Sequence, residues 1–219
     1  MSDERIRKFC SLRADDLVKQ KAEEIMDHCR KAGIDIITIE DPRNPLRFFG
    51  IADMPMVLYI RGRLCINAFE RSVAVIGARR CTQEDKQAAI IITKAELERN
   101  SAIISGMAKG IDSYAHTAAL KNGGYTIAVL GNGPEHCYPA EHRSLYEQIV
   151  GSGSNDNSNG CILSEYPPQT KTRSFMFPQR NRLIAALADE LYVIGAGRHS
   201  GTESTVEAGR RYGRRVGIH

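Results

Sequence analysis

The sequence predicts an α/β fold: an extended, Rossmann-like, doubly wound and mostly parallel sheet with a short α-helical N-terminal lead-in. Short apolar runs alternate with amphipathic stretches from residue 72 to the end of the chain. Strands that are apolar throughout are typical of a parallel sheet covered by helices on both faces. Most of these runs end in a glycine-containing turn, and there is no internal repeat of fixed period.

Two regions are expected, a reduced helical and extended lead-in over 1–70 and the Rossmann-like domain over 71–219. Apolar residues recur at helical spacing over 3–32, and Gly33 is a suitable helix stop. Strands are expected at 34–39, 56–60, 73–76, 102–104, 126–130, 161–163, 191–194 and 215–218. Helices are expected at 84–98, 111–121, 141–150, 178–188 and 202–212, with a tight turn at 61–63 and loops at 151–160 and 165–177.

Composition excludes several classes of protein. The 219 residues are 42% hydrophobic, but no apolar run approaches the ~18 residues of a membrane span, so no membrane partner is expected. The charged N-terminus lacks the apolar centre of a signal peptide, which favours a cytoplasmic protein. The six cysteines lack Cys-x-x-Cys spacing and are expected to be free thiols, and the six histidines lack zinc-ligand spacing.

The segment 105–116 is the first candidate for an anion site. An apolar run precedes it, glycines interrupt it, and a helical pattern follows from Ile111. Glycine permits close approach of a ligand, and the free N–H groups of a helix N-terminus favour anions. Lys109 lies inside this loop, where a phosphate would sit. His116, among alanines on the expected helix, favours a structural role over that of a base.

Other strand ends carry similar residues. Ligands of doubly wound sheets bind beyond the carboxyl ends of the strands. One glycine turn is weak evidence, because many such turns need glycine for steric reasons, but several with nearby cations predict an anion site. The residues expected at this edge are Gly77, Arg79, Ser105, Gly106, Lys109, Ser200 and Gly201.

A dinucleotide or a nucleoside triphosphate is not the expected ligand, and no cofactor is expected. The turn at Gly77 follows the first strand of the domain but lacks the G-x-G-x-x-G pattern. The segment 195–200 comes close to that pattern but follows the wrong strand, and there is no Walker A loop.

A cluster of aromatic and cationic residues begins the helix expected from Pro178. Arginine suits bidentate phosphate contacts, and an exposed ring can stack on a base. The alternative is that Phe177 belongs to the core and that the arginines pair with acids, with Glu165 holding one of them. Because these residues occur together, contacts with a ligand are favoured over the structural alternative. The residues concerned are Phe175, Arg180, Asn181 and Arg182.

Motifs follow one another in a fixed order: Gly77-Ala-Arg79, Ser105 to Asp112, Ala115 to Leu120, Thr126 to Gly133, Tyr138-Pro139, Ser164-Glu165, Phe177 to Ala185 and Ser200-Gly201-Thr202. In this series, over roughly 34–218, the sequence resembles the bacterial DNA-processing protein A family (DprA, also called Smf). The resemblance implies binding of single-stranded DNA without sequence preference and without catalysis. It further implies loading of RecA recombinase in recombination during natural transformation (competence), usually by a homodimer.

Residue roles also follow from the resemblance. Arg79, Lys109, Arg180 and Arg182 would contact phosphates, Gly106 and Gly201 would let the strand approach the main chain, and Phe175 is the candidate to stack on a base. The sequence departs from the family pattern at both ends and at 151–160, which looks like an insertion. Dimerisation and RecA loading are therefore less firmly implied than DNA binding.

Two other functions remain open. One is a nucleoside monophosphate phosphoribohydrolase like the cytokinin-activating LOG proteins, which share this type of sheet. Their motif places a catalytic glutamate two residues after a threonine, whereas here Ser204 follows Thr202 at that spacing. The other is a nucleotide-sensing module.

Overall fold

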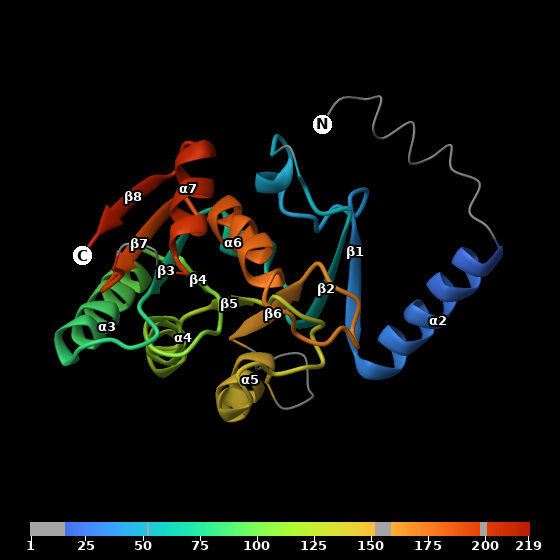
Figure 1. The fold of residues 1–219 in the computed structure, drawn as a ribbon, viewed down its shortest axis with the longest axis horizontal. Helices are drawn as coiled ribbons and strands as arrows, with labels where there is room; N and C mark the ends of the chain where they lie inside the picture. The colour runs from blue at the N-terminus through green and yellow to red at the C-terminus, as the bar shows by residue number, and fades with distance from the viewer. Residues whose placement is uncertain (1–15, 52, 152–158, 198–200) are drawn as a thin grey trace.

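The computed structural model describes residues 16–51, 53–151, 159–197 and 201–219. They form one eight-stranded sheet with the strand order β1-β2-β6-β5-β4-β3-β7-β8 (Figure 1). The strands are β1 (Ile34–Thr38), β2 (Val57–Gly62), β3 (Ser72–Gly77), β4 (Ala102–Ser105), β5 (Thr126–Val129), β6 (Gly160–Ser164), β7 (Glu190–Ile194) and β8 (Arg215–Ile218). The pairs from β6 to β8 are all parallel, which confirms the predicted fold class.

Helices cover both faces of the sheet. In Figure 1, α3, α4 and α5 lie below it and α6 and α7 above it. The helices are α2 (Asp16–Ala32), α3 (Gln83–Glu98), α4 (Ile111–Lys121), α5 (Arg143–Val150), α6 (Met176–Leu187) and α7 (Glu203–Arg211), with short 3-10 turns η1 (Leu46–Phe48), η2 (Ile66–Phe69) and η3 (Ala140–His142). None of the helices in the described ranges is long and apolar enough to cross a bilayer.

Side chains along each strand point alternately to the two faces of the sheet, and so the core has a part on each face. Val73 and Val75 of β3 pack with Ala115 of α4, whereas Ala74 and Ile76 pack in the cluster that includes α6 and α7. Because successive side chains of a strand point to opposite faces, a strand that is covered on both faces is apolar at every position. All six residues of β3 are buried, and this strand is the centre of the fold.

The chain reverses its winding direction at β3. From β3 it proceeds through β4 and β5 to β6, and α6 then carries it back to β7 on the other side of β3. Helices that follow β3 and β7 therefore cover opposite faces, and the ends of these strands are left open. Ligands of doubly wound sheets bind at this point.

The lead-in is joined to the same sheet. Strands β1 and β2 pair antiparallel, and β2 also pairs antiparallel with β6, as far as Gly62 opposite Cys161. This register corrects the tight turn expected at 61–63, because ladder hydrogen bonds keep Arg61 and Gly62 within the strand. The helix expected over 3–32 is confirmed from Asp16, and residues 1–15 lie outside the described ranges. The division at residue 70 stays a prediction.

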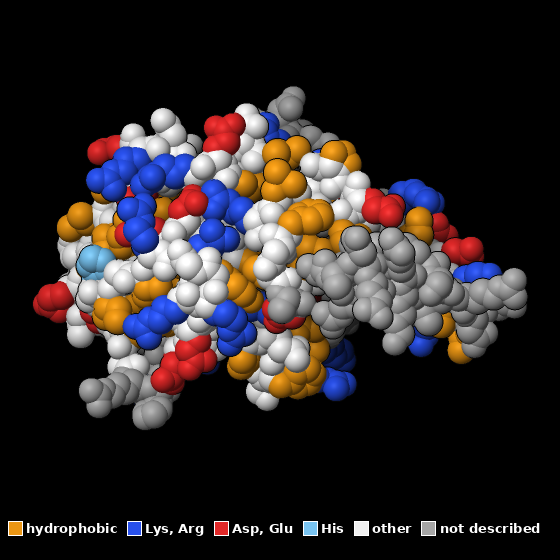
Figure 2. Space-filling view, turned by 90° about the horizontal axis from the view of Figure 1, so that it is seen from above, with side chains coloured by type: hydrophobic (Ala, Val, Ile, Leu, Met, Phe, Trp, Pro, Cys, Tyr) orange, Lys and Arg blue, Asp and Glu red, His pale blue; other side chains and the backbone are white. Residues whose placement is uncertain are grey.

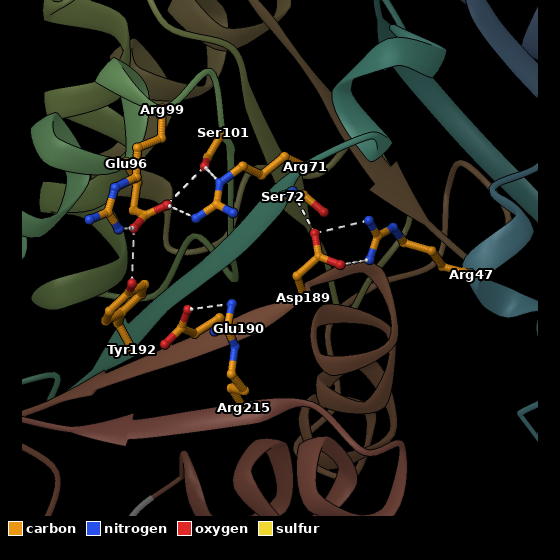
Figure 3. Close-up of polar contacts among 10 residues, drawn as sticks. All are labelled: Arg47, Arg71, Ser72, Glu96, Arg99, Ser101, Asp189, Glu190, Tyr192 and Arg215. Atoms are coloured by element: carbon orange, nitrogen blue, oxygen red, sulfur yellow. Dashed lines mark hydrogen bonds and ion pairs between the residues drawn. The ribbon is translucent and has the colours of Figure 1, made fainter.

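A polar network closes the amino-terminal end of the central strands (Figure 3). Glu96, 2% exposed, accepts hydrogen bonds from Ser101 at 2.8 Å and from Tyr192 at 2.9 Å. Arg71 and Arg99 form ion pairs with the same carboxylate. Nearby, Asp189 pairs with Arg47 and accepts from the Ser72 amide, so that η1, β3 and the start of β7 are held together. The described cysteines are free thiols, as predicted, and Cys10 lies outside the described ranges.

Candidate functional site

A cleft of about 750 Å³ opens at the carboxyl ends of β3 and β7. A smaller hollow beside it shares Arg79, Phe177 and Arg180 and extends to the loop between β4 and α4. Together these hollows bring seven residues predicted from sequence to one edge: Gly77, Arg79, Gly106, Lys109, Arg180, Asn181 and Gly201.

Two loops of this edge pack backbone against backbone. A Cβ atom on Gly77 would lie 2.0 Å from the Ile194 carbonyl oxygen, and one on Gly110 would lie 2.2 Å from that of Ala78. Gly110 also has a φ of +77°, which other residues rarely adopt. The amide of Ile111 donates to the Ala78 carbonyl at 3.2 Å. The main chain itself therefore fixes the loop that carries Arg79 against the loop that carries Lys109.

Arg79 is exposed and lies beside aromatic rings. Its guanidinium carbon is 5.8 Å from the centre of the Phe177 ring, and that ring lies 5.5 Å from the ring of Tyr138. Arg79 has no ion pair with any residue of the described ranges. Phe175, at the start of α6, is 53% exposed. Arg79, Tyr138 and Phe177 line the hollows and so offer a cation and ring faces to a ligand, whereas Phe175 lines neither hollow.

Lys109 is the second accessible cation. Its side chain is 54% exposed and its ammonium group lies 2.7 Å from a carboxylate oxygen of Glu141, which is 56% exposed. Such a surface pair contributes little to stability, about 0–1 kcal/mol. A phosphate can therefore replace the carboxylate at little cost.

Arg180, in contrast, is a buried supporting residue. It is 4% exposed and donates from Nη1 to the carbonyl of Gly106 at 2.6 Å and to that of Val129. Its guanidinium also fills the space above Gly106, where a Cβ would lie 2.4 Å from Nη1. Burial, opposed by the attraction of Asp112, lowers the pKa of Arg180 to about 10. The missing side chain of Gly106 thus makes room for an arginine of the protein.

Asp112 completes this support, although the sequence predicted no role for it. Its carboxylate accepts from the amides of Gly106 at 3.0 Å and Ala108 at 3.3 Å. Burial raises the pKa of Asp112, while Arg180 and these hydrogen bonds act in the opposite direction. The signal was available, because an aspartate at a helix start after a glycine loop commonly binds the loop's amides.

Two further predicted residues also serve the scaffold. The Ser105 hydroxyl is fully buried and donates to the Val75 carbonyl at 2.7 Å, which argues against a direct contact with DNA. Asn181, 6% exposed, donates to the Gly201 carbonyl at 3.0 Å and to Ser204 at 2.9 Å, and so holds the start of α7 to α6. Ser200 lies outside the described residues.

Arg182 lies in a different hollow from Arg180. It forms ion pairs with Glu165 at 2.6 Å and Asp53 at 3.1 Å, and its side chain is 17% exposed. The expectation that Glu165 holds one of these arginines is confirmed. Two carboxylates already compensate this guanidinium, so its predicted contact with phosphate stays a prediction without geometric support.

His116 is structural, as expected from its alanine-rich helix. It is fully buried, and Nδ1 lies 2.7 Å from the Thr126 hydroxyl. Burial, with smaller effects of His142 and Arg180, lowers the pKa of His116 to about 3. Across the described ranges, no three His, Cys, Asp or Glu side chains gather in a way that could hold a metal.

Comparison with known proteins identifies the family. Residues 35–219 match the model of the DNA recombination-mediator protein A family. The chain is 32% identical over 196 residues to DNA processing protein DprA of Bacillus subtilis. This alignment covers 90% of this chain and 64% of that protein. The crystal structure of DNA processing protein A from Streptococcus pneumoniae aligns with a TM-score of 0.78 at 32% identity, over 95% of this chain and 71% of that one.

A second solved structure is similar, that of DNA processing protein A from Helicobacter pylori, which was studied for its single-stranded DNA binding mode. It aligns with a TM-score of 0.73 at 28% identity, over 84% of this chain and 80% of that one. This chain thus spans less than two thirds of the Bacillus subtilis relative but most of the Helicobacter pylori chain. The fold, the ordered motifs and the family match agree: the chain belongs to the DNA recombination-mediator protein A family.

Proposed function

We propose that this protein binds single-stranded DNA, without sequence preference, along the cleft at the carboxyl ends of β3, β4 and β7. The observation that carries the proposal is the pairing of exposed cations with a half-buried aromatic ring on a rigid edge. Arg79 lies over Phe177, and Lys109 stands on the adjacent loop. Cations track the phosphates and rings accept any base, so this combination favours binding without readout of sequence.

The buried residues of the site support this proposal indirectly. Arg180 and Asp112 neutralise one another beneath the loop of Lys109. They hold the loop, and the exposed positive charge of the two hollows comes from Arg79, Arg80 and Lys109. The Helicobacter pylori relative, studied for its single-stranded DNA binding mode, has the same fold over most of its length.

We further propose, from the family, that the bound strand is presented to RecA recombinase during DNA uptake and that a homodimer does so. Recombination mediation is the activity by which the family is named. Mixing the protein with RecA and single-stranded DNA coated by a single-strand binding protein tests this step. RecA filament formation should be faster with this protein than without it.

Binding rather than catalysis is the proposed activity. Ser204, which stands where phosphoribohydrolases of this sheet type have their glutamate, accepts a hydrogen bond from Asn181 at 2.9 Å. It therefore serves the junction of α6 and α7. Release of free base from nucleoside monophosphates would contradict this assignment, and no measurable release is expected.

The test is a titration of fluorescent oligo-dT, followed by anisotropy at several salt concentrations. Arg79→Glu and Lys109→Glu should each weaken binding roughly tenfold or more, because a charge-assisted contact contributes about 1.5–3 kcal/mol. The slope of log affinity against log salt should fall by about 0.7 for each lost phosphate contact. Arg210→Glu makes the same charge change in the last turn of α7, away from the cleft, and serves as the control. Unchanged affinity in both cleft variants would remove the proposed site.

A further inference from the structure

A line of basic side chains continues from the cleft across η3 and the start of α5. It consists of Lys109, Arg143 and Arg61, which we call the basic strip. Arg143 belongs to none of the motifs noted in the sequence. The strip bears on the proposed DNA-binding function, because it determines where a bound strand would leave the cleft.

The first link joins the cleft to η3. Lys109 pairs with Glu141 of η3 at 2.7 Å, and Nδ1 of the adjacent His142 lies 3.0 Å from the Met107 carbonyl oxygen. These contacts hold η3 against the loop between β4 and α4. Arg143, the next residue along, therefore begins α5 close to the loop of Lys109.

The second link is the ring of Tyr146, which is fully buried. The guanidinium carbons of Arg143 and Arg61 lie 5.6 Å and 5.7 Å from the centre of this one ring. The Tyr146 hydroxyl donates to the Pro134 carbonyl, just beyond the end of β5, and lies 3.4 Å from Nη1 of Arg61. Although Arg61 comes from β2, its guanidinium thus lies beside the tyrosine that contacts the segment following β5.

The charges of the strip remain available to a phosphate. Arg61 has no carboxylate partner among the residues that the structure describes. Arg143 pairs with Glu147 at 2.6 Å, but both side chains are substantially exposed, at 57% and 42%. Pairs of this kind exchange readily, since water and salt screen them.

The opposite way out of the cleft is less favourable for DNA. Helix α7 begins at the cleft, and its exposed residues nearest the opening are Glu203 and Glu207, whereas Arg210 and Arg211 lie in its last turn. Figure 2, which looks onto the side of α6 and α7, shows Lys and Arg side chains in separate groups with Asp and Glu between them. Among the described residues on that side, the Lys and Arg side chains therefore form no continuous basic path.

We propose that single-stranded nucleic acid held in the cleft leaves it over η3 and α5, with backbone phosphates contacting Arg143 and Arg61. This inference rests on the proposed DNA binding. It predicts that affinity rises with oligonucleotide length beyond the length that fills the cleft, and that this gain depends on the basic strip. The recognised chemistry is a chain of phosphates, so DNA and RNA are compared directly.

The experiment titrates wild-type protein and the double variant Arg61→Gln with Arg143→Gln against oligo-dT of about 4 to about 20 nucleotides. This range extends beyond the sites of about 4–16 nucleotides that single-strand binding folds occupy. For the longest oligonucleotides, the variant should bind roughly fivefold to tenfold more weakly, with a salt slope smaller by about 1.4, which corresponds to two phosphates. For the shortest, its affinity should change by less than about twofold. The control is Arg210→Gln with Arg211→Gln, which removes the same charge on α7 and should leave both affinities unchanged.

Arg61 packs on a buried ring, so thermal unfolding of each variant is compared with that of the wild type. The single variant Arg143→Gln changes a side chain that is exposed in the folded protein, and it supplies a second measurement. Its salt slope should be smaller than that of the wild type by about 0.7, half of the change expected for the double variant. Equal length dependence in variant and wild type would overturn the proposed path, as would an equal loss in the α7 control. Tight binding of oligo-dT with no length dependence overturns the path but leaves the cleft as the site. Failure of wild-type protein to bind any oligo-dT overturns both, and tight binding of oligo-rU alone would redirect the site to RNA.

Discussion

Replacement of Arg180 by methionine separates support of the cleft from contact with DNA. The family resemblance implies that Arg180 contacts phosphate, whereas the structure buries it and directs Nη1 to two carbonyl groups. Methionine preserves much of the side-chain volume but removes the charge and the donors. Asp112 would then remain buried without its opposite charge.

The size of the effect follows from these contacts. Removing one member of a buried charge pair costs about 3–5 kcal/mol. Since the carboxylate of Asp112 keeps its two amide donors, the lower end, about 3 kcal/mol, is expected. With a urea dependence of about 2 kcal/mol per M, the unfolding midpoint should fall by about 1.5 M. Exchanging Asp112 for asparagine as well should restore part of the loss, because neither charge is then left alone.

Urea unfolding and oligo-dT binding are measured on the same preparations. If Arg180 supports the loop, stability falls, and any remaining DNA binding keeps the wild-type salt slope. A phosphate contact would give the reverse, namely stability within about 0.5 kcal/mol of the wild type and a salt slope smaller by about 0.7. That second result would refute the structural argument.

Two further predictions concern groups that stabilise the fold outside the cleft. Only the unfolded chain takes up the His116 proton between pH 6.5, its ordinary pKa, and about 3, its pKa in the fold. Keeping His116 neutral therefore costs nothing above pH 6.5, where the unfolded chain is also neutral at this residue. Below pH 6.5, the free energy of unfolding should fall by about 1.4 kcal/mol for each pH unit until the pH reaches about 3. Unfolding of His116→Gln should show a shallower dependence over this range, and parallel curves would contradict the assignment. Glu96→Ala should destabilise the protein by about 1–3 kcal/mol, because it removes the acceptor of Ser101 and Tyr192 while the partly exposed Arg71 stays hydrated. The folded variant should bind oligo-dT like the wild type, and a changed affinity would show that the two ends of the sheet are coupled.

The sequence was sufficient for the sheet and for the edge that carries the site. Continuous apolar runs such as that of β3 predicted buried parallel strands, and glycine turns marked their carboxyl ends. The short extension of β2 to Gly62 was missed, because its cause is a ladder with β6, which lies about 100 residues away in the chain. Long-range pairing of this kind leaves no local pattern.

The sequence could not tell a supporting arginine from a binding one. Arg79, Arg180 and Arg182 all occur in motifs at strand or helix ends, and composition gives each the same charge. Burial distinguishes them: Arg79 is exposed, Arg180 is enclosed beneath the loop of Gly106, and Arg182 is compensated by two carboxylates. Their roles depend on which groups meet across the fold, and that information exists only once the tertiary structure is formed.

The contact between the loops at Gly77 and Gly110 has a consequence for the thermodynamics of binding. Because the main chain sets the separation of these loops, the scaffold has little conformational freedom to lose when a ligand arrives. The entropic cost of complex formation then falls mainly on the flexible ligand and on the exposed side chains. Exchanges among those side chains can retune affinity without altering the frame that positions them.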